Sequence, residues 1–198
     1  LPMDLIPRVV TATEWRVVSE GVAQRIRALE AFLADVYDRG DIMRDGVVPK
    51  SLVTSSSHYH RQAHGIVPAN GVRIHVAGVD LVRDEEGTFH VLEDNLRCPS
   101  GVSYVLENRR TLAHVAPEVF TGYRVAPVTE YPERLYRALA AAAPRDVHDP
   151  TVVVLTPGVY NSAHFEHAFL ARRMGAELVE GRDLFCRGGF VYMRTTQG

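Results

Sequence analysis

The acidic residues of one hairpin-like segment are the first candidates for chemistry. The segment GVDLVRDEEGTFHVLEDN (78–95) has two apolar stretches around a polar turn, yet it carries Asp80 in the first stretch and Glu93 and Asn95 at the end of the second. With the turn centred just before Gly87, Asp80 faces Glu93. Directly paired side chains project from the same face of a sheet, with Cβ atoms about 5 Å apart. Asn95, two residues beyond Glu93, shares that face.

This set of oxygen-bearing side chains suits a divalent metal ion. Two facing carboxylates repel each other, and removal from water adds to the cost. A cation between them offsets both effects, and Mg²⁺ binds a few protein oxygens while water and nucleotide phosphates fill its other positions. Asn95 faces Gly78, which leaves room, whereas Asp94 points to the other face. The register therefore predicts Asp80, Glu93 and Asn95 as metal ligands; the alternative is a polar face that simply meets water.

Histidines form a second group of candidates. His58, His60 and His64 have H-x-H-x3-H spacing, which could ligate zinc. Histidines in a polar loop without a neighbouring cysteine or acid are more often incidental, and that interpretation is favoured here. His164 and His167, at the start of an expected helix, offer a second metal pair. The alternative for them is packing, capping or exposure to solvent.

The loop TPGVYNSA (156–163) follows an apolar run and precedes a helical pattern. Because open α/β sheets bind ligands at the carboxyl ends of their strands, we expect Tyr160, Asn161 and Ser162 to face a substrate. A plain helix cap is the alternative. Arg83, in the first strand of the hairpin, is expected either to contact phosphate or to pair with Asp94 across the strands.

The elements that position these residues can be predicted from periodicity and turn signals. An amphipathic helix with a threonine N-cap is expected early in the chain, and a β-loop-α-β unit of the parallel kind near its end. The expected helices are 11–40, 49–53, 100–115 (opening on Ser100), 132–143 and 164–175; the expected strands and hairpins are 72–95, 151–155, 176–181 and 185–194, with a loop at 54–71 and a linker at 144–150. This pattern predicts an α/β (α+β) fold.

Long stretches of the chain resemble a known family. HVAGVDLVRDEEGTFHVLEDNLRCPSGVSYVLENRR (75–110), TPGVYNSAHFEHAFLARRMGAELVEGRDL (156–184) and VYMRTTQG (191–198) are similar to circularly permuted ATP-grasp proteins of type 2, related to glutathionylspermidine synthase. The metal hairpin precedes the strand-loop-helix unit here, as permutation requires. The resemblance implies part of an ATP-grasp core with a metal-site hairpin over residues 1–145, followed over 146–198 by the start of a Rossmann-like pre-ATP-grasp domain, which we expect to be truncated.

The resemblance also implies roles for individual residues. The three hairpin residues would hold Mg²⁺ ions that bridge the ATP phosphates. Arg97, Ser100 and Gly101, on the loop after the hairpin, would face the phosphates or the acceptor substrate. Arg61 and His64, on the loop before the hairpin, would reach the same active site.

The reaction implied is ATP-dependent ligation of a carboxylate to an amine or a thiol, with small molecules or peptides as substrates. The carboxylate attacks the γ-phosphate, and a nucleophile then attacks the acyl phosphate. This chemistry depends on charge neutralisation and in-line positioning. A non-catalytic nucleotide- or metal-binding scaffold module is the alternative function, and a zinc hydrolase built on the histidine loop is a third.

A shortage of lysine limits what the chain is expected to do alone. ATP-grasp enzymes use lysines of a lid subdomain to hold the ATP phosphates, and Lys50 is the one lysine of this sequence. We therefore expect an N-terminal fragment that lacks the lid, binds ATP poorly and turns over nothing by itself.

Composition excludes several classes of protein. A net charge of −2 argues against nucleic-acid binding, and no stretch predicts a membrane span or a signal peptide. Cys98 and Cys186 do not form a disulfide scaffold, and a reducing, cytoplasmic setting is expected. Cys98 lacks a neighbouring base and is interpreted as a small packing residue. The oligomeric state is open, with a homo-oligomer among the alternatives.

Overall fold

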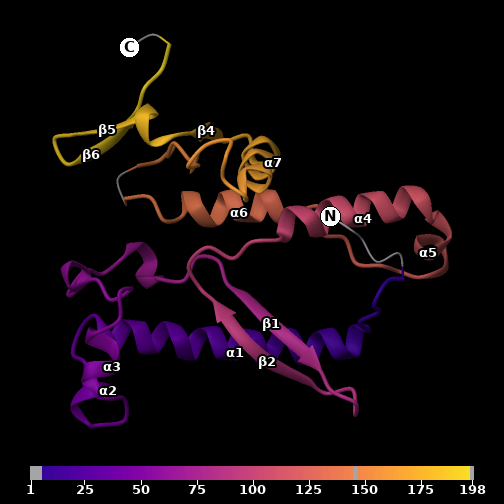
Figure 1. Ribbon diagram of the computed structural model, residues 1–198, viewed down its shortest axis with the longest axis horizontal. Coiled ribbons are helices and arrows are strands. Elements are labelled where there is room, and N and C mark those ends of the chain that lie inside the picture. Colours follow the sequence, from indigo (N-terminus) through magenta and orange to yellow (C-terminus); the bar gives the residue numbers. More distant parts are fainter. Residues whose placement is uncertain (1–5, 145–146, 197–198) are drawn as a thin grey trace. The chain divides into compact units, whose positions relative to one another are not determined.

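A computed structural model describes residues 6–144 and 147–196 (Figure 1). They form two compact units: Arg8–Pro99, and the residues from Ser100 onward together with the segment that ends at Pro7. Both units mix helices and strands, and the described strands form three two-stranded sheets. This content agrees with the predicted α/β class. The predicted domain boundary, between residues 145 and 146, lies outside the described residues and stays a prediction.

The elements follow the predicted order closely. The unit Arg8–Pro99 contains α1 (Ala12–Val36), α2 (Asp41–Arg44), α3 (Lys50–Thr54), the 3-10 turns η1 (Arg61–Ala63) and η2 (Ala69–Gly71), and strands β1 (Gly78–Arg83) and β2 (Phe89–Asn95). The other unit contains α4 (Val102–Val115), α5 (Pro117–Gly122), α6 (Tyr131–Ala140), β3 (Val153–Leu155), α7 (His164–Met174), β4 (Glu177–Val179), η3 (Gly181–Asp183), β5 (Leu184–Arg187) and β6 (Phe190–Met193). Among these described elements, none is a helix with the length and apolar character of a membrane span.

The long helix α1 begins at the predicted N-cap. The Thr11 hydroxyl accepts from the Glu14 N–H at 3.3 Å, and the Glu14 carboxylate accepts from the Thr11 N–H at 2.7 Å, which makes a reciprocal capping box. The helix ends at Val36, four residues before the expected end. Gly40 has φ +65° and serves as the N-cap of the short helix α2, because glycine adopts this left-handed conformation at little cost.

The second unit contains the predicted β-loop-α-β arrangement. Strands β3 and β4 are parallel and pair Val153 with Glu177 and Leu155 with Val179, while α7 forms the connection between them (Figure 1). Helix α7 ends at Gly175, whose φ of +71° is typical of a helix C-terminus. The carboxyl ends of both strands therefore lie at one edge, where the loop 156–163 begins.

The other predicted helices need corrections. Helix α6 ends at Ala140, before the predicted end at residue 143, and helices α2 and α5 were not predicted. Helix α4 begins at Val102 with Gly101 (φ +104°) as its N-cap and without a side-chain cap, so Ser100 does not open the helix. Buried apolar side chains of this unit come from α4, α7 and β4, and include Leu106, Phe169 and Val179.

Candidate functional site

The β1–β2 hairpin has the predicted pairing of the acidic residues. Asp80 pairs with Glu93, and Gly78 pairs with Asn95. The predicted centre of the turn lies half a residue too far along the chain, because Leu81 pairs with Val91. The strands shift register between Asp80 and Leu81. One extra residue on β2, Leu92, forms a β-bulge there and restores the pairing of the acids. Leu92 is 70% exposed.

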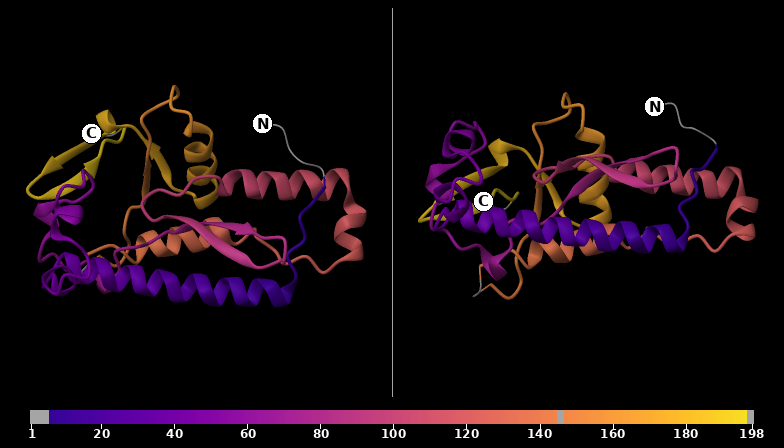
Figure 2. Two further views of the ribbon diagram at one scale, coloured as in Figure 1. Left: turned by 60° about the horizontal axis from the view of Figure 1, so that its bottom comes forward. Right: turned by 90° about the horizontal axis from the view of Figure 1, so that it is seen from below.

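The two faces of the hairpin have different chemistry. One face lies against α1; the hairpin crosses this helix obliquely in Figure 1 and lies beside it in both views of Figure 2. Arg25 of α1 donates from Nε and Nη2 to the Asp94 carboxylate at 2.8 and 2.7 Å. Arg83 pairs with Glu14 and also donates to the Gly87 carbonyl at 3.3 Å. Both ion pairs lie on the face that is opposite the paired acids.

The Asp94 carboxylate is held through both of its oxygens. The Arg25 guanidinium, which donates to both carboxylate oxygens, holds the pKa of Asp94 below its usual value, mainly through the hydrogen bond. This confirms that Asp94 is on the other face from Asp80. It also shows that Arg83 pairs with Glu14 and not with Asp94.

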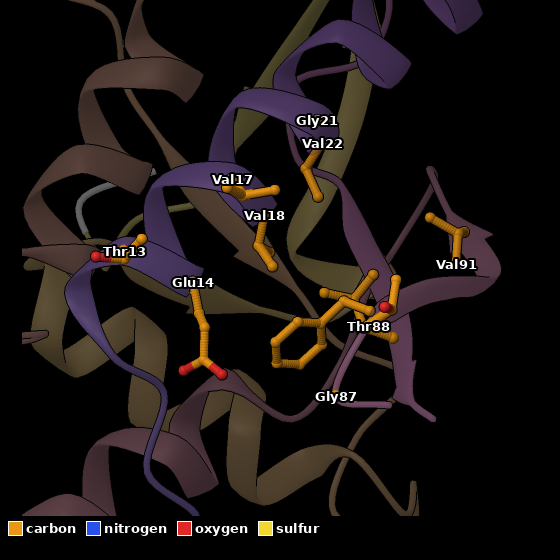
Figure 3. A pocket seen from close by; sticks show the side chains of 11 residues that line it. Thr13, Glu14, Val17, Val18, Gly21, Val22, Gly87, Thr88 and Val91 are labelled. Carbon is orange, nitrogen blue, oxygen red and sulfur yellow. The ribbon is translucent and has the colours of Figure 1, made fainter. Parts of the chain in front are cut away.

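A cavity of about 440 Å³ lies between α1 and this packed face (Figure 3). The two ion pairs Arg25–Asp94 and Glu14–Arg83 join the helix to the hairpin on this same face. Apolar side chains of the helix and the hairpin supply most of the lining, which comprises Thr13, Glu14, Val17, Val18, Gly21, Val22, Leu81, Gly87, Thr88, Phe89 and Val91.

The outward face presents the acids to solvent. Asp80, Glu93 and Asn95 are exposed, and the Asn95 amide nitrogen donates to Glu93 Oε1 at 2.9 Å and to Asp80 Oδ2 at 3.5 Å. A hydrogen bond shared with Glu93 raises the pKa of Asp80, and desolvation and the charge of Glu93 act in the same direction. The two carboxyl groups therefore interact directly, and the pair resists full ionisation.

The sequence suggested that Gly78 leaves room for an ion, and the structure contradicts this. A Cβ atom at this position would lie 2.6 Å from Cβ of Pro99 and 3.7 Å from Cβ of Asn95. The missing side chain instead allows the segment after the hairpin to return close to β1. Glycine is needed here for a close approach between two parts of the backbone.

The loop after the hairpin is held by a carboxylate that sequence reasoning missed. Both oxygens of Glu166, on α7, accept from the Gly101 N–H at 2.9 and 2.7 Å, and the Ser103 hydroxyl donates to the same carboxylate. Glu166 is 6% exposed and Ser103 is fully buried. The Gly101 N–H is therefore engaged inside the protein. Arg97 and Ser100 are exposed, and their side chains make no hydrogen bond within the described residues.

The histidine loop before the hairpin is tied to the end of α1. The Gly65 N–H donates to the Tyr37 carbonyl at 2.7 Å, and Tyr37 stacks on Tyr59 at 5.4 Å between ring centroids. Arg61 and His64 are exposed on this loop. Within the described residues, no three histidine, cysteine, aspartate or glutamate side chains gather into a group that could hold a metal ion.

The loop between β3 and α7 divides into an exposed and a structural part. Tyr160 is fully exposed at 101%. The Asn161 side chain accepts from the Ala163 N–H at 2.9 Å, which supports the helix-cap alternative for this residue. Ser162 is exposed. Thr156, which sequence reasoning did not single out, is 3% exposed at the start of the loop and contacts two histidines of α7.

Comparisons with known proteins show what the chain is similar to in sequence. Residues 7–198 match a family model described as "A circularly permuted ATPgrasp". An uncharacterized protein of Mycobacterium tuberculosis (strain ATCC 25618 / H37Rv) is 64% identical over 197 residues, which is 100% of this chain and 36% of that protein. One of Synechocystis sp. is 51% identical over 197 residues, 100% of this chain and 41% of its own length.

A further relative carries a functional name. A Frankia casuarinae protein named "Putative glutamate--cysteine ligase 2-2" is 43% identical over 194 residues, which is 98% of this chain and 22% of that protein. The chain thus spans well under half the length of these relatives.

Proposed function

Because the chain belongs to the circularly permuted ATP-grasp family, we propose that it is part of an enzyme that uses ATP and Mg²⁺ to join a carboxylate to an amine or a thiol. The ligase name of the Frankia relative supports this proposal. In the proposed reaction the carboxylate attacks the γ-phosphate of ATP, ADP leaves, and an acyl phosphate forms. The nucleophile then attacks the acyl phosphate, and phosphate leaves as the amide or thioester bond forms. A relation to glutathionylspermidine synthase remains part of the proposal.

The observation that carries the proposal is the outward acidic face of the hairpin. Asp80, Glu93 and Asn95 together offer carboxylate and amide oxygens, which are the ligands that Mg²⁺ prefers. The Asn95 amide now turns its nitrogen toward both acids, so it must rotate to present its oxygen to a cation. When bound, Mg²⁺ supplies the positive charge that the ATP phosphates require.

The remaining candidate residues have different roles in the proposed site. Arg97 and Ser100 are exposed and able to meet phosphate, and Arg61 and His64 are proposed for the same site. Gly101 is proposed only as a backbone support, because its N–H already donates to a carboxylate. Arg83 is left out because its ion pair lies on the face away from the acids.

A second function is a nucleotide- or metal-binding scaffold without catalysis. Lid lysines elsewhere in the full-length protein would favour the ligase, and their absence there would favour the scaffold. The lid lysines of ATP-grasp enzymes have no counterpart in these 198 residues. We therefore propose that this chain by itself binds ATP weakly and turns over nothing, so that it forms neither ADP nor a ligation product. Measured ADP formation by the isolated chain with MgATP would contradict that part of the proposal.

The metal assignment is tested with Mn²⁺, a paramagnetic substitute for Mg²⁺ that broadens NMR signals of nearby atoms. Three proteins are compared: the unaltered chain, Glu93→Gln, and Glu85→Gln as the matched control. Glu85 is an exposed acid of the same hairpin, in its turn. We expect Mn²⁺ to broaden the Asn95 side-chain amide in the unaltered chain and in the control, and Mg²⁺ to reverse the broadening. Equal broadening in Glu93→Gln would refute the metal site.

ATP binding is tested by calorimetry on the same three proteins, with and without Mg²⁺. We expect weak binding that requires Mg²⁺ and is lost in Glu93→Gln but retained in Glu85→Gln. If the substitution of Glu93 leaves Mg²⁺-dependent binding unchanged, this face of the hairpin is not the nucleotide site.

A further inference from the structure

Thr156 is the centre of a buried polar cluster at the carboxyl edge of the parallel strands. It follows β3 directly and is 3% exposed. Its hydroxyl oxygen accepts from the Gly158 N–H at 3.2 Å and lies 3.0 Å from Nδ1 of His167 and 3.5 Å from Nδ1 of His164. Two histidines of the first turn of α7 thus share one hydroxyl group.

The number of hydrogen bonds available to Thr156 fixes the state of both rings. A hydroxyl group has one proton and two lone pairs. The Gly158 N–H occupies one lone pair. For both histidine contacts to be hydrogen bonds, one histidine accepts the hydroxyl proton at Nδ1 and the other donates its Nδ1–H to the remaining lone pair. In the neutral state the two rings therefore hold opposite tautomers, whichever way the hydroxyl points.

The outer nitrogens of the two rings are open to a ligand. Neither Nε2 atom has a hydrogen bond within the described residues, and both histidines are partly exposed. Because the tautomers are opposite, one Nε2 carries a proton and the other carries a lone pair. The pair presents one donor and one acceptor, three residues apart on one helix.

This arrangement disfavours the metal pair that the sequence allowed for His164 and His167. A metal bound by both Nε2 lone pairs requires a proton on each Nδ1. Thr156 would then receive three donors, counting Gly158, with only two lone pairs to accept them. A ligand that supplies one acceptor and one donor avoids this conflict.

We propose that the outer nitrogens of His164 and His167 bind an amide group of the substrate or product. A primary amide offers a carbonyl acceptor and an N–H donor side by side, and a peptide offers them from neighbouring amide groups, whereas a carboxylate offers acceptors alone and an ammonium group offers donors alone. The position at the carboxyl ends of β3 and β4 is where open α/β sheets bind ligands. The proposal rests on the ligase function above and names peptide-like compounds as its substrate class.

The tautomers are measured first, by long-range ¹H–¹⁵N NMR of the histidine rings at pH 8, where ordinary histidines are neutral. Thr156→Val removes the shared hydroxyl, and Thr156→Ser is the matched control that keeps it. We expect opposite tautomers for His164 and His167 in the unaltered chain and in the serine variant, and the loss of this relation in the valine variant. The same tautomer at both rings of the unaltered chain would overturn the inference.

Ligand class is tested by titration of the unaltered chain with three probes of similar size: acetamide, acetate and ethylammonium. We expect acetamide to shift the ring signals of both histidines, and the other two probes to bind about tenfold more weakly, the factor that one missing hydrogen bond gives. Equal effects of the three probes, or none, would overturn the proposal. The titrations contain no ATP or metal, so a failed Mn²⁺ or ATP experiment leaves their outcome unaffected.

Discussion

Replacement of Glu166 is the most direct test of how the loop after the hairpin is held. The carboxylate is 6% exposed and accepts from the Gly101 N–H and from the fully buried Ser103 hydroxyl. Glu166→Ala leaves the buried Ser103 hydroxyl and the part-buried Gly101 N–H without a partner. An unsatisfied buried donor costs about 1–3 kcal/mol, so we expect the free energy of unfolding of this unit to fall by roughly 2–6 kcal/mol. Ser103→Ala removes one donor and leaves no unsatisfied hydroxyl behind, so the free energy of unfolding is expected to fall less than in Glu166→Ala.

Hydrogen exchange measured by NMR is the suitable assay, because a chain of two units need not unfold in one step. The amides of α4, including Leu106, report on the unit that contains Glu166. Glu118→Ala is the matched control, since Glu118 is an exposed acid in the same unit. If Glu166→Ala accelerates exchange no more than Glu118→Ala does, the carboxylate does not hold the loop. A double-mutant cycle with Ser103→Ala should give a coupling of about 1 kcal/mol or more.

Three further outcomes follow from the hairpin. Gly78→Ala places a Cβ atom 2.6 Å from Pro99, and the resulting overpacking should lower the free energy of unfolding by about 1–3 kcal/mol in urea titrations. Asp94, whose pKa Arg25 lowers, should stabilise the hairpin above its unfolded pKa of about 3.9 and lose this contribution as pH falls through the lower folded value. Asp94→Asn should therefore weaken the dependence of the free energy of unfolding on pH in the acidic range, as measured by circular dichroism. Deletion of the bulge residue Leu92 leaves the acids aligned in a regular ladder, so Mn²⁺ should still broaden the Asn95 amide.

Local signals in the sequence predicted a large part of the fold. The capping box of Thr11 and Glu14 lies within one helical turn, and the glycines at 40 and 175 adopt the left-handed conformations that end or begin helices. The β3–α7–β4 unit follows from a change of hydrophobic period along the chain. Such signals depend on residues close in sequence, and for that reason they can be interpreted without a structure.

Interactions between distant residues were not predictable in the same way. Glu166 lies 65 positions from Gly101, and on its own helix it has the appearance of an ordinary exposed acid. Arg25 lies 69 positions from Asp94, and the sequence suggested Arg83 as the partner of Asp94 instead. In both cases the charge was visible, but its partner depends on how elements pack.

The bulge at Leu92 shows how two errors in a prediction can cancel. The sequence placed the turn half a residue too late and assumed a regular ladder. The extra residue, Leu92, lies between the turn and the acids and shifts the pairing of the strands, so that Asp80 still pairs with Glu93. The pairing of Asp80 with Glu93 was therefore predicted correctly, although the predicted ladder lacked the bulge. Bulges are common next to active sites.

The two faces of the hairpin separate the residues that stabilise the fold from those that do not. Packing on α1 uses the ion pairs of Arg25 with Asp94 and of Glu14 with Arg83. Asp80 and Glu93 lie on the opposite face. Since the folded pKa of Asp80 is raised, the pair favours the fold at acidic pH and opposes it as pH rises through that folded value.

At neutral pH the paired acids thus lower stability and contribute nothing to packing on α1. A bound cation reverses the sign of this interaction, because each carboxylate then faces an opposite charge. Added Mg²⁺ should consequently raise the unfolding midpoint of the unaltered chain at pH 7 and have little effect on Glu93→Gln. In the absence of metal, Glu93→Gln should be at least as stable as the unaltered chain. A destabilised Glu93→Gln in metal-free urea titrations would show that the acids serve the fold, and the argument for a metal-binding face would lose its physical basis.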